Sequence, residues 1–128
     1  MKKITGAKTK LEKYVQAEIN EHAEGYNESG AEGFLNDLLS HGCQSGMVGS
    51  LIYYADTLKF YKKYKKEITE LLKEMLSDTG YNSPAELFGD KWDKGDIFAE
   101  DTQNQNLLAW FGFEETARKL ADRNGIEI

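Results

Sequence analysis

The stretch from His41 to Leu76 constrains the fold more than any other part of the chain. From about Ser45 onward, apolar residues recur at three- and four-residue steps, which is the spacing of one face of an α-helix. These residues are Leu51, Tyr54, Ala55, Leu58, Tyr61, Tyr64, Ile68, Leu71, Leu72 and Met75. The pattern predicts one long amphipathic helix from about Ser45 to Ser77, with a break or bend at Asp56–Thr57. Ser45 is the expected N-cap; alternatively, the glycines after it lie within a helix so that another backbone can approach closely.

Periodicity and helix-start signals predict further helices on both sides of this stretch. They lie between Lys8 and Ala23, between Ser29 and Gly42, over about one turn after Ser83, and between about Gln103 and Asn124. No stretch alternates apolar and polar residues for long enough to predict a strand. The expected fold is therefore all-α, a compact bundle of about four longer helices plus a short helix and one long loop, 89–102. Residues 1–128 are expected to form a single helical domain with a frayed start, 1–7.

Composition sets further bounds on the class of protein. A chain of 128 residues suits one domain, and an apolar fraction of 40% favours a folded core. The net charge of −6 gives no general attraction to nucleic acid or anionic membrane, and the apolar runs are too short to cross a membrane. The start of the sequence lacks the apolar segment of a signal peptide, and one cysteine excludes an intramolecular disulfide framework. We expect a cytoplasmic protein without a membrane partner.

The single cysteine, Cys43, is the candidate for covalent chemistry. It follows Gly42 and precedes the expected helix start, and a helix N-terminus lowers the pKa of a thiol. His41 and His22 are the only imidazoles that could act as its base. The favoured alternative is a small buried residue at a crowded turn, because cysteine is among the most often buried residue types. One cysteine and two histidines also fall short of a four-ligand zinc site, so we expect no metal and no cofactor.

The loop 89–102 is the first candidate for a binding surface. Its five acidic residues and two lysines give a local charge of −3, and aromatic residues lie among them. The candidate contact residues are Asp90, Trp92, Asp93, Asp96 and Phe98. The spacing does not fit a calcium loop, because the third and fifth ligand positions would fall on Trp92 and a lysine. Either this loop binds a basic partner, or its aromatic side chains simply pin it to the helices, which is slightly favoured.

A row of lysines on the long helix is the second candidate. Lys59, Lys62, Lys63 and Lys66 are spaced i, i+3, i+4 and i+7, and therefore share one helix face. Such a face could grip phosphates while the flanking Tyr61 and Tyr64 stack on bases. The favoured alternative is a solvated face paired with nearby glutamates, because the chain as a whole is acidic. Direct nucleic-acid binding is therefore not expected.

Several sequence blocks carry a resemblance that covers about Lys8 to Leu120. The blocks are Gly42-Cys43-Gln44-Ser45-Gly46-Met47, Leu51-Ile52-Tyr53-Tyr54, Leu87-Phe88-Gly89-Asp90, Asn106-Leu107-Leu108-Ala109-Trp110-Phe111 and Phe113-Glu114-Glu115-Thr116-Ala117. Together they resemble small uncharacterised proteins encoded by phages and mobile elements of gut Firmicutes and Bacteroidetes. No site residue is carried over from that group.

The resemblance implies a phage-like genetic setting, in which small proteins often bind a host machine, defence nucleases included. The prediction is a non-enzymatic protein-binding module that inhibits or modulates a host defence or nucleic-acid machine, in the manner of an anti-CRISPR protein. Its partner would be a host protein or protein–nucleic-acid complex. The alternative is a small enzyme with Cys43 as its nucleophile.

Overall fold

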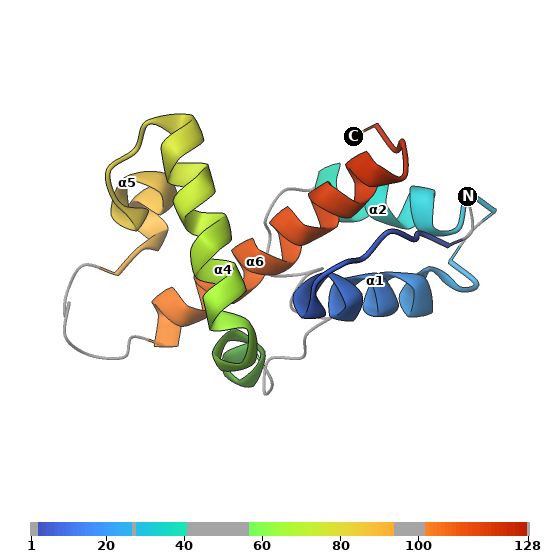
Figure 1. Cartoon of the computed structure of the whole chain (residues 1–128), viewed down its shortest axis with the longest axis horizontal. Coiled ribbons are helices and arrows are strands. Elements are labelled where there is room, and N and C mark those ends of the chain that lie inside the picture. The colour runs from blue at the N-terminus through green and yellow to red at the C-terminus, as the bar shows by residue number, and fades with distance from the viewer. Residues whose placement is uncertain (1–2, 27, 41–56, 94–101, 128) are drawn as a thin grey trace. The chain divides into compact units, whose positions relative to one another are not determined.

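A computed structural model describes residues 3–26, 28–40, 57–93 and 102–127. The regular secondary structure within these ranges is helical throughout, and the all-α prediction is confirmed (Figure 1). The elements are α1 (Lys10–Ala23), α2 (Ala31–Ser40), α4 (Thr57–Thr79), α5 (Pro84–Phe88), the 3-10 turn η2 (Gly89–Lys91) and α6 (Thr102–Arg123). The predicted start of the long helix near Ser45 lies outside the described residues.

The chain divides into two compact units, and the division falls inside α6. Unit 1 comprises residues 1–51 and 113–128, and therefore includes α1, α2 and the second half of α6. Unit 2 comprises residues 52–112, and therefore includes α4, α5, η2 and the first half of α6. The two units thus share one helix.

In unit 1, α1 starts at a complete capping box. The Thr9 hydroxyl accepts a hydrogen bond from the amide of Glu12, and the Glu12 carboxylate accepts one from the amide of Thr9. Apolar residues at helical spacing then leave α1 with one buried face, which packs with α2. The core of the unit contains Leu11, Val15, Ile19, Leu35, Leu38, Phe113, Ala117 and Leu120.

The segment before α1 is ordered in unit 1. Ile4 is only 1% exposed, and the backbone amides of residues 4, 5 and 7 donate hydrogen bonds to side chains of later residues. The prediction of a frayed start is therefore wrong for residues 4–7. The side chains that hold this segment are distant in sequence, and a short non-helical segment has no periodicity. Nothing in the local sequence therefore indicates that the segment is ordered.

In unit 2, α4 buries an aromatic face that includes Phe60, Tyr61 and Tyr64, followed by Ile68. Tyr64 has non-helical backbone angles, φ −112° and ψ 18°, and α4 is kinked at this residue. The sequence placed a bend at Asp56–Thr57 instead; Thr57 is the first residue of α4, and Asp56 lies outside the described part of the chain.

The short helix α5 forms as its start signal predicts. The Ser83 hydroxyl accepts a hydrogen bond from the amide of Glu86 at 3.3 Å, and Pro84 occupies the first turn. Gly89 ends the helix with φ +60°, a conformation that favours glycine. The expected loop 89–102 does not begin as a loop, because residues 89–91 form η2. Residues 94–101 of that loop are not described.

Candidate functional site

Of the residues proposed for covalent chemistry, only His22 belongs to the described part of the chain. Cys43 and His41 lie outside the described residues. His22 is exposed on α1, where its Nδ1 lies 2.8 Å from the backbone oxygen and 3.7 Å from the carboxylate of Glu18. Its ring stacks near Phe34 at a centroid distance of 6.4 Å. The contacts of His22 are thus those of a helix-surface residue.

Two further features are absent from the described residues. Within them, no three His, Cys, Asp or Glu side chains converge so as to hold a metal ion. In the same ranges, no helix has the length and hydropathy to cross a membrane.

The lysine face of α4, formed by Lys59, Lys62, Lys63 and Lys66, is exposed along its length. All four side chains face solvent, and their pairing with nearby glutamates stays a prediction. Lys63 Nζ lies 5.5 Å from the centroid of the Tyr64 ring. The two tyrosines named in the nucleic-acid alternative, Tyr61 and Tyr64, are only 7% and 8% exposed, which leaves little ring surface for stacking on a base. Their rings belong to the core face of α4.

Trp92 lies at the end of a stack of aromatic rings in unit 2. Its ring is parallel to that of Phe88, with a centroid distance of 5.6 Å and an interplanar angle of 10°. Phe88 in turn meets Phe111 of α6 edge-on at 5.9 Å. Trp92 is half-buried, and this packing supports the interpretation in which Trp92 pins its segment to the helices. Phe98 and Asp96 lie outside the described residues.

The backbone beside Trp92 is tied to the first turn of α6 by side-chain amides. The Asp93 amide donates to Asn104 Oδ1 at 2.8 Å, and Asn104 Nδ2 donates back to the Asp93 carbonyl at 2.9 Å. Gln103 Nε2 donates to the Lys91 carbonyl at 2.7 Å. Sequence reasoning missed Gln103 and Asn104; the only signal is that they open an amide-rich run at the predicted helix start.

These contacts frame an open cavity of about 430 Å³, hereafter the Trp92 pocket. It is lined by Gly89, Asp90, Trp92, Asp93 and Gln103. Its volume lies in the range of ordinary ligand sites, and an aromatic ring beside carboxylates attracts a cation through both the ring face and the charge. Of the candidate residues in the loop, the structure therefore brings together Asp90, Trp92 and Asp93.

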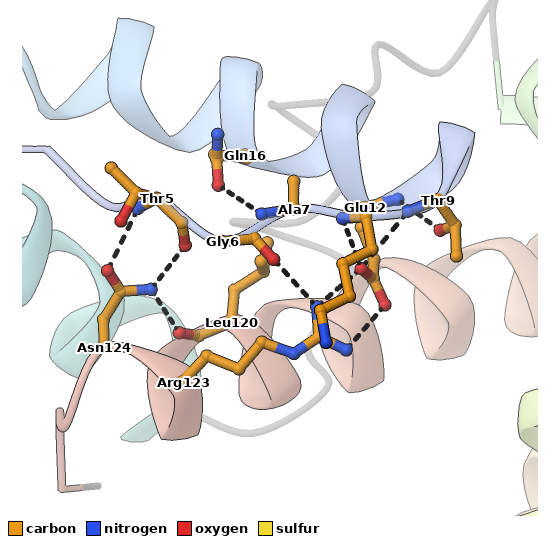
Figure 2. Close-up of polar contacts among 10 residues, drawn as sticks. Thr5, Gly6, Ala7, Thr9, Glu12, Gln16, Leu120, Arg123 and Asn124 are labelled. Atoms are coloured by element: carbon orange, nitrogen blue, oxygen red, sulfur yellow. Dashed lines mark hydrogen bonds and ion pairs between the residues drawn. The ribbon is translucent and has the colours of Figure 1, made fainter.

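A second polar cluster, in unit 1, was not foreseen from the sequence. Arg123 near the end of α6 pairs with Glu12 of α1, with Nη1–Oε1 at 2.5 Å and Nη2–Oε2 at 3.0 Å (Figure 2). The hydrogen bond from Arg123 lowers the pKa of Glu12 to about 2, although burial acts in the opposite direction. The backbone amides of Lys8 and Thr9, which donate to the same carboxylate, also contribute to this low pKa. This cluster holds the segment before α1 in place.

Comparison with known proteins identifies the family but not the activity. No curated protein and no solved structure matches the chain. The model of one family, described as a domain of unknown function (DUF7222), matches residues 8–127, which is nearly the whole sequence, and the chain therefore belongs to this family.

Proposed function

We propose that this protein is a non-enzymatic protein-binding module, and that it takes a basic side chain of its partner into the Trp92 pocket. The observation that carries the proposal is the open cavity that a stacked tryptophan lines together with two aspartates. The stacking on Phe88 and the amide bonds from Gln103 and Asn104 hold the site in one shape before any partner arrives. A preorganised site loses little conformational entropy on binding.

The partner class follows from charge. The carboxylates of Asp90 and Asp93 attract a basic surface to the pocket. Tryptophan is among the residue types enriched at binding hot spots. Enzymes that act on nucleic acids carry basic surfaces, and the resemblance described above implies a phage-like setting. We therefore propose that the protein acts in the cytoplasm as an inhibitor or modulator of a host defence or nucleic-acid machine.

The test of the pocket uses two labelled peptides, hexa-arginine and hexa-glutamate, measured by fluorescence anisotropy. Hexa-arginine should bind and hexa-glutamate should not. The double variant Asp90→Asn/Asp93→Asn should lose at least tenfold in affinity, because both carboxylates of the pocket are neutralised. A matched control, Asp78→Asn/Asp122→Asn, removes two exposed carboxylates elsewhere and should stay within twofold of the wild type. Equal losses in the two double variants would contradict a specific pocket.

The partner itself is sought by affinity capture from a bacterial lysate, read by mass spectrometry. A protein held by the wild type and by the control variant, but lost with Asp90→Asn/Asp93→Asn, is the expected result. The enzymatic alternative is tested separately by thiol labelling, since a nucleophilic Cys43 would react fast and an inert one would not.

A further inference from the structure

Residues 4–8 of unit 1 are held by side chains, and none of their backbone groups bonds to the backbone of another described element. Figure 2 shows the segment lying between α1 and the end of α6, with polar side chains directed at its backbone from both sides. Side chains on α1 and at the end of α6 bind backbone amides or carbonyls of five successive residues, 4–8. A segment held in this way is recognised chiefly through its main chain.

Two asparagines form the centre of this arrangement, hereafter the asparagine clamp. Asn20 of α1 closes a ring with Ile4: the Ile4 amide donates to Oδ1 at 2.8 Å, and Nδ2 donates to the Ile4 carbonyl at 3.0 Å. Asn124, next after α6, closes the same ring with Thr5, at 3.0 Å and 2.8 Å. Each carboxamide supplies one donor and one acceptor, as a neighbouring β-strand would.

The alternation of the two rings identifies an extended peptide as the ligand. In an extended chain, the amide and carbonyl of one residue face one edge, and those of the next residue face the opposite edge. The clamp matches this alternation, because Asn20 takes Ile4 from α1 and Asn124 takes Thr5 from the other side. On the side of the bound segment, these ring contacts involve only main-chain atoms.

The remaining contacts define a short side-chain pattern. Ile4 is 1% exposed, so the site buries an aliphatic side chain at this position. Gly6 has φ +91°, where a side chain is strained, and its carbonyl accepts from Arg123 Nη1 at 3.2 Å. The Ala7 amide donates to Gln16 Oε1 at 3.1 Å, and the Lys8 amide donates to Glu12 Oε1 at 2.8 Å. The sequence pattern that fits the site is therefore an aliphatic residue, any residue, then glycine.

We propose that the asparagine clamp is a receptor site for extended peptides, filled in cis by residues 4–8, and that it accepts a partner protein's segment of the pattern aliphatic–x–glycine in trans. This is strand addition in which side-chain amides replace the sheet edge. The tether to α1 gives the cis segment an effective concentration of about a millimolar, so a partner competes with it and binds more weakly than the isolated site would allow. The inference is independent of the Trp92 pocket, which lies in unit 2.

The experiment uses the full chain with Ile4→Asp, which expels the cis segment by placing a charge in the core. A labelled peptide of residues 2–10 should bind this variant at least tenfold more tightly than it binds the wild type. The same peptide carrying aspartate at position 4, or methylated at the backbone nitrogens of positions 4 and 5, should not bind. Asn20→Ala or Asn124→Ala, added to the Ile4→Asp chain, should reduce affinity at least tenfold.

The matched control is Asn82→Ala, because Asn82 is an exposed asparagine of unit 2 whose backbone amide, which the substitution keeps, donates to the Glu86 carboxylate. It should leave peptide affinity unchanged. Absence of binding by a folded Ile4→Asp chain would overturn the proposal, and so would binding that ignores both Asn20→Ala and Asn124→Ala. If Ile4→Asp does not fold, the milder Ile4→Ala is used, ¹⁵N-labelled. Unlabelled peptide should then shift the resonances of residues 4–7, and unmoved resonances would overturn the proposal.

Discussion

At the scale of single residues, the Glu12–Arg123 pair makes a pH-dependent contribution to stability. The folded-state pKa of Glu12, about 2, lies below its ordinary value of 4.5. A carboxyl group with a lowered pKa stabilises the fold above its unfolded pKa, and the contribution is lost as pH falls through the folded value. Because Glu12 is only 8% exposed, the full contribution is roughly 2–3 kcal/mol.

We therefore expect Arg123→Gln to lower the free energy of unfolding at pH 7 by roughly 2–3 kcal/mol. At pH 2.5 the same substitution should lower it much less. Urea unfolding of the two proteins at several pH values measures the difference. The difference should narrow as pH falls from about 4.5 to 2. A difference that stays constant across this range would contradict the role of the ion pair. Arg123→Lys is the matched control, since it keeps the charge but loses the two-pronged contact.

Trp92 supports a second prediction at this scale. Its ring is half-buried and stacked on one neighbour, so Trp92→Ala should cost about 1–2 kcal/mol, less than the loss of a fully buried tryptophan. Calorimetry should show a fall in melting temperature of several degrees. Trp92→Phe keeps a ring over Phe88 and should recover most of the loss. An unchanged melting temperature in Trp92→Ala would show that the ring is not anchored.

At the scale of helices, α4 and α6 approach closely at one glycine. A Cβ built on Gly112 would lie 2.6 Å from Cγ1 of Ile68, which is too close for any pair of carbon atoms. Gly112→Ala should therefore destabilise the fold by about 1–3 kcal/mol, although alanine is the better helix former. Denaturant unfolding of Gly112→Ala, Ile68→Ala and the double variant tests the contact, because alanine at position 68 removes the clashing Cγ1. The double variant should be more stable than the sum of the single changes predicts.

The lysine face of α4 supports a prediction about nucleic acid. The buried tyrosines remove base stacking, so only phosphate contacts remain, and these weaken steeply with salt. We expect no measurable binding of duplex DNA at physiological salt by fluorescence anisotropy. Salt-sensitive binding would contradict this if it disappeared on changing Lys59, Lys62, Lys63 and Lys66 to glutamine, but not on changing Lys3, Lys8, Lys10 and Lys13.

The sequence predicted helices well where their signals are local. The Ser83–Pro84 start and the apolar face of α1 are set by residues within a turn or two of each other, and both formed as expected. The kink at Tyr64 and the close approach at Gly112 depend on what packs against each helix, so periodicity could not reveal them.

The candidate sites divide in the same way. Part of the Trp92 pocket could be predicted, because its acidic and aromatic residues are neighbours in sequence. The contribution of Gln103 and Asn104 could not, because they come from another helix. The asparagine clamp could not be predicted from the sequence, because Asn124 and Thr5 are separated by 119 positions. An isolated asparagine carries no pattern that distinguishes a clamp from a solvated surface residue.

At the scale of the whole molecule, the boundary between the two compact units falls within the continuous helix α6, between Gly112 and Phe113. Breaking α6 at that point would leave backbone amides and carbonyls without their helical partners, which opposes independent unfolding of either unit. We therefore expect a single cooperative unfolding transition. The chain offers a direct test, because both tryptophans, Trp92 and Trp110, belong to unit 2.

Tryptophan fluorescence thus reports the unfolding of unit 2, while far-UV circular dichroism reports the helices of both units. In urea, the two signals should give the same midpoint and slope, since coincident probes indicate a two-state transition. Gly112→Ala changes a residue of unit 2 alone. It should nevertheless move the fluorescence and circular-dichroism unfolding curves to lower urea by the same amount. Fluorescence that changes at lower urea than circular dichroism, with the gap widened by Gly112→Ala, would show that unit 1 remains folded after unit 2 opens.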